Sequence, residues 1–398
     1  EHFLEIFKEA VKCRLRSMGP VGADLSGGLD SSSIVCLAQS LYRAGQSSDH
    51  GFETFSLVFP PGTPSDERSY IDDVAKKWAL KANRLAEHVP AASCYQESVS
   101  RSLDFPYYPN GVGGNALRAL ARTKGIRVNL TGHGGDERLG HSMRHYADLL
   151  RRGDIPSFVR EMRSDASSIG TAAAISRALS LGLAPLLPDN VRRAIRSLRG
   201  RNNGFFPWIN PEFARRVNLI ERLHPSRSGP RFPTFAQQDV YKEVFQGNNI
   251  HPYELEERSD SWFGLEGRHP FEDRRIAEFA VQLPESQRWR GRREKFVLRQ
   301  AMRGLLPESV RQRSGKGDFT NLFEDAFRLL GGETLFESLA IEPLGWVDAI
   351  WARRMLGLEL DVNACVRLRE RGISYCFPMW MIFGINLWFQ TVFLEAER

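Results

Sequence analysis

The sequence lacks the two commonest nucleotide-binding signatures, because it contains neither a GxxxxGK[ST] stretch nor a GxGxxG turn. P-loop nucleotide hydrolases and dinucleotide-binding enzymes are therefore disfavoured. The five cysteines are odd in number and form no CxxC pair, which is typical of a chain in a reducing cytosol. His141 and His145 lie four residues apart, but no HExxH and no suitably spaced third ligand accompany them, which argues against a histidine metal site.

Long runs of one charge are also missing. The net charge is +6, and the basic residues are scattered, so we expect no nucleic-acid partner. No signal peptide is recognisable near Glu1. Residues 373–394 approach the length of a membrane span, but Pro378, Gly384, Asn386 and Gln390 interrupt this apolar run. We therefore expect a buried helix here, no membrane span and a cytoplasmic protein.

The stretch Asp24–Ser33, Asp-Leu-Ser-Gly-Gly-Leu-Asp-Ser-Ser-Ser, has the pattern of a strand, a tight turn and a helix start. Gly27 and Gly28 permit a sharp turn, and the serines can cap the helix. Free N–H groups at a helix N-terminus favour an anion such as a phosphate. Asp30 adds a carboxylate, which is appropriate if Mg²⁺ bridges it to that anion. The stretch therefore predicts a pyrophosphate cradle, with a merely structural cap as the alternative.

Strand and helix patterns alternate through the first part of the chain. Buried strands are predicted at 21–25, 53–59 and 126–130, with a weaker strand at 83–89. Helical patterns lie between them, which argues for a parallel sheet with helices on both faces and with ligands at the carboxyl ends of the strands.

A second glycine-rich loop, Thr131–Glu137, follows the strand at 126–130 and should lie at the same edge of the sheet. Asp136 can supply a second carboxylate for Mg²⁺, and helix capping is the alternative role. His133 is a candidate general base as a neutral imidazole, with a simple loop hydrogen bond as the alternative. Glu256, Glu257 and Asp260 are carboxylates that could orient His133 or an amine, and the sequence does not choose among them.

The order Ser-Gly-Gly-Leu-Asp-Ser-Ser resembles the pyrophosphate loop of the asparagine synthetase family. Thr131–Glu137 is similar to the second signature of that family, Gly-x-Gly-x-Asp, with His133 at a position that is glutamate in asparagine synthetases. Three later segments also resemble family elements, at 265–273, 293–299 and 306–319. In the last of these, one extra residue, Ser314 or Gly315, precedes Lys316.

This resemblance implies an α/β fold with a five-stranded parallel sheet of the PP-loop ATP pyrophosphatase, HUP-like type, followed by a mostly helical region. It implies three parts: a nucleotide-binding core at 1–145, a helical and linker insertion at 146–250, and a helical part at 251–398 that closes over the site. The segment at 265–273 would start a helix facing the pocket.

The implied reaction uses ATP and Mg²⁺ to adenylate a carboxylate and release pyrophosphate, after which an amine displaces AMP. Asp30 and Asp136 would hold Mg²⁺, and His133 and Lys316 would serve amide formation. Val58 and Gly132 would flank the adenine. The residues expected to bind the nucleotide or its pyrophosphate are Leu25, Ser26, Gly27, Gly28, Asp30, Ser31, Ser32, Val58, Thr131, Gly132 and Lys295.

The identity of the amide is less constrained. His133, the Gly-Lys-Gly loop and the large insertion favour a bulky acceptor, as in lasso-peptide macrolactam cyclases, which would imply a precursor peptide and leader-binding or peptidase partners. The alternative is asparagine synthesis from a small carboxylate. Because the sequence begins with Glu1 rather than methionine, an N-terminal glutaminase-like domain would then belong to the full-length protein. A non-catalytic nucleotide-binding partner protein is the third hypothesis.

Overall fold

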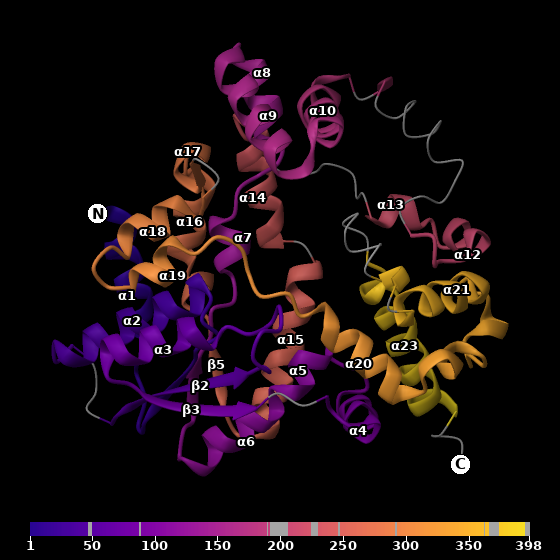
Figure 1. Cartoon of the computed structure of the whole chain (residues 1–398), viewed down its shortest axis with the longest axis horizontal. Helices are drawn as coiled ribbons and strands as arrows, with labels where there is room; N and C mark the ends of the chain where they lie inside the picture. Colours follow the sequence, from indigo (N-terminus) through magenta and orange to yellow (C-terminus); the bar gives the residue numbers. More distant parts are fainter. Residues whose placement is uncertain are drawn as a thin grey trace.

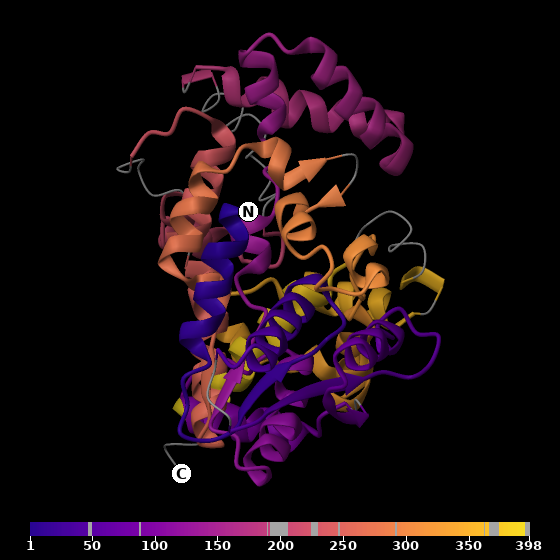
Figure 2. The same ribbon diagram turned by 90° about the vertical axis from the view of Figure 1, so that its left-hand side faces the viewer.

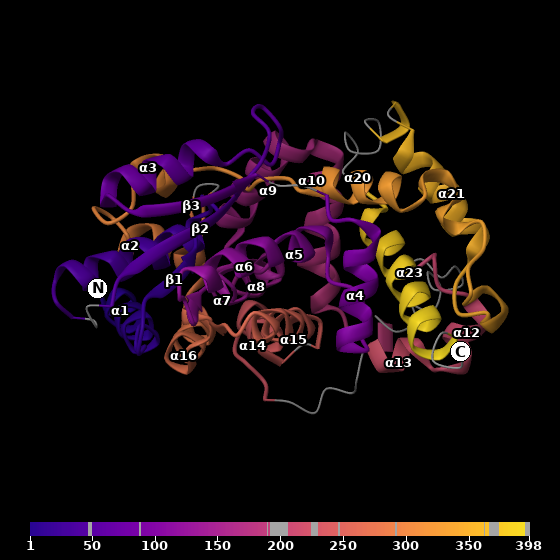
Figure 3. The same ribbon diagram turned by 90° about the horizontal axis from the view of Figure 1, so that it is seen from below.

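The computed structural model describes residues 1–46, 50–86, 89–188, 190–191, 206–223, 230–245, 247–290, 293–361, 363–365 and 374–394. An α/β region and a helical region lie side by side, as the views in Figure 1 and Figure 3 agree. Helices from the middle of the chain form a third part, at the end of the molecule away from the sheet (Figure 2).

A five-stranded parallel sheet forms the centre of the α/β region, in the order β3-β2-β1-β4-β5. The chain reverses direction across the sheet between β1 and β4, and in open α/β sheets ligands bind at such a point. The expected five-stranded parallel sheet is confirmed. The strands are β1 (Val21–Asp24), β2 (Phe52–Val58), β3 (Lys81–Ala86), β4 (Val128–Leu130) and β5 (Glu266–Arg268).

Helices cover both faces of this sheet, as expected. One face carries most of them, packed on a core that includes Phe7, Val21 and Ile34. On the other face, α6 packs around Phe55 and Ile126. The helices of the first face are α1 (His2–Arg14), α2 (Leu29–Arg43), α3 (Arg68–Trp78), α16 (Arg274–Gln282), α18 (Phe296–Ala301) and α19 (Glu308–Gln312), and α6 spans Asn115–Thr123.

Two strands differ from the sequence expectation. β3 begins at Lys81 rather than residue 83, because this edge strand is largely exposed and carries no hydrophobic alternation that marks its start. Residues 87 and 88 of the expected strand lie outside the described residues. The segment at 265–273 first forms β5 and a 3-10 turn, η3 (Pro270–Glu272), and its helix α16 begins only after the N-cap Asp273. The fifth strand thus comes from beyond residue 145, whereas the predicted domain limits themselves stay a prediction.

The middle of the chain is helical where the structure describes it. Residues 189, 192–205, 224–229 and 246 of the expected insertion lie outside the described residues. The elements between the sheet and α16 are α4 (Ala92–Ser102), α5 (Pro109–Gly113), α7 (Gly135–Leu139), α8 (His145–Arg151), α9 (Ile155–Ile169), α10 (Thr171–Ala178), η1 (Leu179–Leu183), η2 (Ala184–Leu186), α12 (Pro211–Arg216), α13 (Leu219–Leu223), α14 (Phe235–Phe245) and α15 (Gly247–Trp262).

The helical region has its own core around Trp380, which packs edge-on against Tyr95 and Phe323. Its last helix, at Cys376–Leu394, is long and apolar enough to cross a membrane, and 33% of its apolar window is buried. Met379, Trp380 and Ile382 face the core, which supports a core role. The remaining elements are α17 (Glu285–Arg288), β6 (Trp289–Arg290), β7 (Arg293–Glu294), α20 (Thr320–Leu330), η4 (Gly332–Phe336), η5 (Glu342–Leu344), α21 (Ala349–Leu360), α23 (Cys376–Phe389) and η6 (Gln390–Leu394).

Candidate active site

The first glycine-rich loop joins β1 to the N-terminus of α2. Gly27 has a φ of +84°, a conformation that residues with a Cβ rarely adopt. Ser31 Oγ accepts a hydrogen bond from Ser26 N–H at 3.2 Å and lies 2.9 Å from Ser26 Oγ, so the first turn of the helix fixes the loop. Ser32 Oγ is buried and has no hydrogen-bond partner among the described residues. The loop therefore has the backbone shape and the hydroxyl groups of an anion cradle.

The second loop, after β4, touches the first. A Cβ on Gly132 would lie 2.9 Å from the backbone nitrogen of Ser31, so only glycine allows the two loops to approach this closely. Thr131 Oγ1 lies 2.6 Å from His269 Nδ1 and accepts a hydrogen bond from His133 N–H at 3.3 Å. The predicted meeting of the two loops at one edge of the sheet is therefore what the structure has.

Asp30 and Asp136, the two predicted magnesium ligands, face one another across Lys295. The Lys295 ammonium is ion-paired with Asp30 Oδ2 and lies 2.6 Å from Asp136 Oδ1. Only 3% of the Lys295 side chain is exposed, and its φ of +54° at the N-cap of α18 fixes the backbone from which it projects. Lys316 pairs with the other oxygen of Asp136 and is 62% exposed. Of the two predicted lysines, Lys295 is therefore the central one.

These groups fit a magnesium ion. Asp30 Oδ1 is buried without a hydrogen-bond partner, and a Cβ on Gly135 would lie 2.5 Å from the Asp30 carboxyl carbon, so the second loop is pressed against that carboxylate. Burial opposes ionisation of Asp136, but the charges of Lys295 and Lys316 outweigh it and lower its pKa to about 2. Two carboxylates beside a phosphate cradle are the donors that protein-bound Mg²⁺ usually takes.

His133 is paired with Glu256, which resolves the choice that the sequence left open. Its Nε2 lies 2.9 Å from Glu256 Oε1, an oxygen that also accepts a hydrogen bond from Tyr107 at 3.3 Å. Glu257 is exposed, and Asp260 is bound to Arg118 instead. Burial alone would lower the pKa of His133, but the hydrogen bond and charge of Glu256 outweigh it and raise the pKa to about 9. At neutral pH the imidazole is therefore charged, which corrects the expectation of a neutral one.

A cavity of about 310 Å³ opens beside the two loops. Asp24, Glu256 and Asp260 supply three carboxylates to its wall, against the cationic groups of Arg118 and His133. Burial raises the pKa of Asp24 to about 6, although the hydrogen bond from Asn129 opposes this shift. Apolar side chains complete the wall, namely Leu25, Phe55, Leu57, Phe59, Leu117, Ala121, Leu265 and Phe319.

The segment that carries Lys316 is anchored on the first loop. Arg313 donates a hydrogen bond to the Gly27 carbonyl at 3.1 Å and is ion-paired with Glu67. Gly317 N–H donates to the same glutamate at 3.3 Å. Beyond the lysine, Phe319 packs against Phe59 with ring centroids 5.2 Å apart. The extra residue before Lys316 therefore does not prevent this lysine from reaching Asp136.

The structure thus brings most of the predicted residues together. Val58 is different: its side chain packs on the core of the first face, and its neighbours Leu57 and Phe59 line the cavity. Gly132 contacts Ser31 and does not line the cavity, so its place beside an adenine stays a prediction. The residues that sequence reasoning missed are Asp24, Glu67, Tyr107, Arg118 and Arg313. Asp24 alone had a signal, as a charged residue ending a buried strand.

The geometry described above is accompanied by a match along the chain. The profile of the family described as "Asparagine synthase" matches residues 2–390. The chain belongs to the asparagine synthase family. This is a family of ATP-dependent carbon–nitrogen ligases.

Curated relatives of the asparagine synthase family chain carry two kinds of name. "Amidase chry2" of Gibberella zeae is 26% identical over 356 residues, covering 77% of this chain and 50% of the relative. "Amidase chyE" of Penicillium rubens is 25% identical, covering 76% and 49%. "Asparagine synthetase [glutamine-hydrolyzing] 1" of Bacillus subtilis is 24% identical, covering 78% and 48%. The chain therefore spans about half the length of the curated relatives it matches.

Proposed function

We propose that this chain forms an amide bond from a carboxylate and an amine at the expense of ATP. The observation that carries the proposal is the convergence of Asp30, Asp136 and Lys295 beside the first loop, with the His133–Glu256 pair on the second loop. One set of groups suits pyrophosphate release and the other suits proton transfer. Both lie at the carboxyl ends of β1 and β4, within reach of one substrate.

In the first step the substrate carboxylate attacks the α-phosphate of ATP, giving an acyl-adenylate and pyrophosphate. The hydroxyls of Ser26, Ser31 and Ser32 and the loop N–H groups bind the departing phosphates. Lys295 and Lys316 stabilise the charge that develops on them. Mg²⁺, held by Asp30 and Asp136, would supply further charge neutralisation at the phosphate oxygens.

In the second step an amine attacks the acyl carbon and AMP leaves. The carboxylates of Asp24, Glu256 and Asp260 suit an amine acceptor, since their field attracts a cation. The attacking nitrogen must lose a proton, and the His133–Glu256 pair is the group placed to take it. His133 acts in this way in its neutral form, which Glu256 makes scarce at neutral pH and more abundant near pH 9.

For the acceptor, we propose an amine of a peptide, with an aspartate or glutamate side chain of the same peptide as the carboxylate. The support is the His133–Glu256 pair, at a position that is glutamate in asparagine synthetases, and the helical insertion. A precursor peptide, peptidase partners and a cytoplasmic setting belong to this proposal. The names of the relatives favour the second candidate, in which ammonia amidates a small carboxylate such as aspartate.

One experiment separates these functions. The purified chain is given ATP and Mg²⁺ with either aspartate and ammonia or peptides carrying a free N-terminal amine and an internal acidic residue, and pyrophosphate and product masses are followed. A peptide product that has lost one water supports the peptide proposal, whereas asparagine overturns it in favour of the second candidate. ATP binding without pyrophosphate release from any carboxylate would instead indicate a non-catalytic nucleotide-binding protein.

A further inference from the structure

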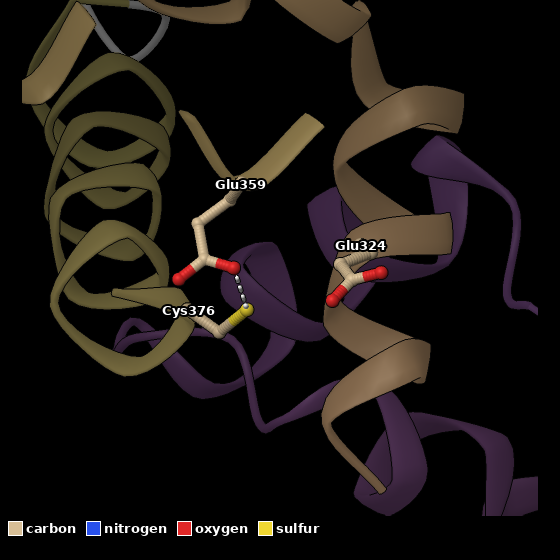
Figure 4. A group of neighbouring side chains, drawn as sticks. All are labelled: Glu324, Glu359 and Cys376. Carbon is tan, nitrogen blue, oxygen red and sulfur yellow. Dashed lines mark hydrogen bonds between the residues drawn. The ribbon is translucent and has the colours of Figure 1, made fainter. Parts of the chain in front are cut away.

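A second cluster of ionisable side chains lies in the core of the helical region, remote in the fold from the two glycine-rich loops. Glu324 comes from α20, Glu359 from α21, Cys365 from the segment after α21, and Cys376 from the first turn of α23. All four are buried. Figure 4 shows the Glu359 carboxylate beside the Cys376 sulfur, with the Glu324 carboxylate on the opposite side of that sulfur. The proposed ligase chemistry uses none of them.

The donor atoms of this cluster converge. Cys365 Sγ lies 3.1 Å from Glu324 Oε1 and 3.6 Å from Glu359 Oε2. Cys376 Sγ lies 3.7 Å from the same oxygen of Glu359. One ligand atom from each of Glu324, Glu359 and Cys376 can be chosen so that all lie within 4.8 Å of one another. Two thiols and two carboxylates therefore surround a single small volume.

Charge at this cluster is poorly compensated. The Glu359 side chain is 1% exposed, and its hydrogen-bond donors are the thiols of Cys365 and Cys376 and the backbone N–H of Tyr375. Among the described residues, Glu359 is ion-paired with no lysine, arginine or histidine. A buried carboxylate that lacks a cationic partner is costly, and thiols are weak donors. The site would be stabilised by a cation that can take sulfur as well as oxygen ligands.

The spacing of the donors matches one such cation. With Zn–S and Zn–O distances of about 2.3 and 2.0 Å, neighbouring sulfur and oxygen ligands on a tetrahedral zinc ion are about 3.5 Å apart. The three sulfur–oxygen distances in the cluster are 3.1, 3.6 and 3.7 Å. Magnesium and calcium prefer all-oxygen ligands, so the two sulfurs favour zinc over them.

We propose that Glu324, Glu359, Cys365 and Cys376 bind one Zn²⁺ ion. Binding converts both thiols to thiolates and releases their two protons to solvent, so two thiolates and two carboxylates offset the charge of the metal. Four protein ligands leave no open coordination position, as in structural zinc sites. The ion therefore ties α20, α21 and the start of α23 together and takes no part in the reaction.

The first test is metal content. The full chain, expressed with zinc and freed of loosely bound ions, should contain about one zinc ion per molecule by mass spectrometry. Cys376→Ala and Glu359→Gln should lose most of it. Cys36→Ala, which removes a buried cysteine from the other core, is the matched control and should retain the metal. Asp136→Asn should also retain it, because the zinc is not at the nucleotide site.

The second test does not depend on how the variants fold. Replacing zinc by Co²⁺ in the wild-type chain should give the absorption of thiolate-bound cobalt, and a strong chelator should lower the melting temperature, with recovery on adding Zn²⁺ but not Mg²⁺. A wild-type chain without zinc that gives no cobalt–thiolate band would overturn the proposal. A mass showing a Cys365–Cys376 disulfide in the native chain would also overturn it.

Discussion

Two pairs of carboxylates join distant parts of this chain, and the protein treats them differently. In the α/β region, Asp30 and Asp136 come from two loops and share the buried ammonium of Lys295. In the helical region, Glu324 and Glu359 come from two helices, and Glu359 is held by thiols and a backbone N–H. One pair carries its own cation, and the other is surrounded by weak neutral donors.

The difference suits two kinds of site. A pair neutralised by a lysine remains stable while phosphates and their metal ion come and go, as a catalytic cycle requires. A buried pair that depends on an external cation is best served by one that stays. The contrast therefore separates a site built for turnover from a site built to hold a structure together.

The largest effect is expected at Asp30. Asp30→Asn keeps the shape of the side chain but removes its charge beside the phosphates, so carboxylate-dependent pyrophosphate release should fall by about 1,000-fold. The measurement is the rate of pyrophosphate formation at saturating ATP. Asp72→Asn, on an exposed part of α3, is the control and should leave the rate unchanged. A loss smaller than about tenfold at Asp30 would remove it from the site.

The two lysines should separate next. Lys295→Met leaves two carboxylates facing each other without their buried cation, which should lower the free energy of unfolding by about 3 kcal/mol. Lys316→Met removes an exposed partner and should change it by less than about 0.5 kcal/mol, although amide formation should still fall. Urea unfolding of both variants beside single-turnover assays measures the pair. Equal destabilisation by the two would show that Lys295 does not hold the carboxylates together.

The sheet could be predicted because its inner strands are buried on both faces and are followed by glycine-rich turns. The 126–130 stretch has that pattern, and β4 lies within it. β3 is at an exposed edge, so its start had no hydrophobic signal. β5 could not be found by pattern alone, since Glu266–Arg268 contains no hydrophobic residue and becomes a strand only by pairing with β4.

At the site, the sequence indicated residues that follow strands or stand between glycines. It could not rank Lys295 above Lys316, because burial decides between them and burial is set by distant segments. The same reason hid Arg118, which comes from a helix with no distinctive motif and is buried through its contact with Asp260. Glu256 was one of several acidic residues on one helix, and only the helix orientation selects it.

A smaller effect is expected at His133. His133→Gln should slow amide formation by about 100-fold at pH 9 while adenylation continues, since the side chain serves only the second step. In the wild type, amide formation should rise with pH towards the pKa of about 9, because the imidazole accepts a proton only when it is neutral. Glu256→Gln removes the charge that raises this pKa, so the rising limb should move to lower pH.

The control for this pair is Glu257→Gln, since Glu257 is the exposed neighbour of Glu256 on α15. Its pH profile should coincide with that of the wild type. If Glu256→Gln and Glu257→Gln shifted the limb equally, the effect would come from the general charge of the helix and not from the contact with His133. If neither shifted it, the limb would belong to another group.

The smallest effect is expected at Glu359 in protein stripped of metal. There the carboxyl is held only by neutral donors, so Glu359→Gln should change the free energy of unfolding by less than about 1 kcal/mol, because replacing an unpaired buried charge by a neutral group costs little. With zinc present the same substitution should abolish the stabilisation by the metal. Urea unfolding with and without Zn²⁺ measures both values. A large loss in the stripped protein would mean that Glu359 has a cationic partner of its own, and the contrast between the two carboxylate pairs would then disappear.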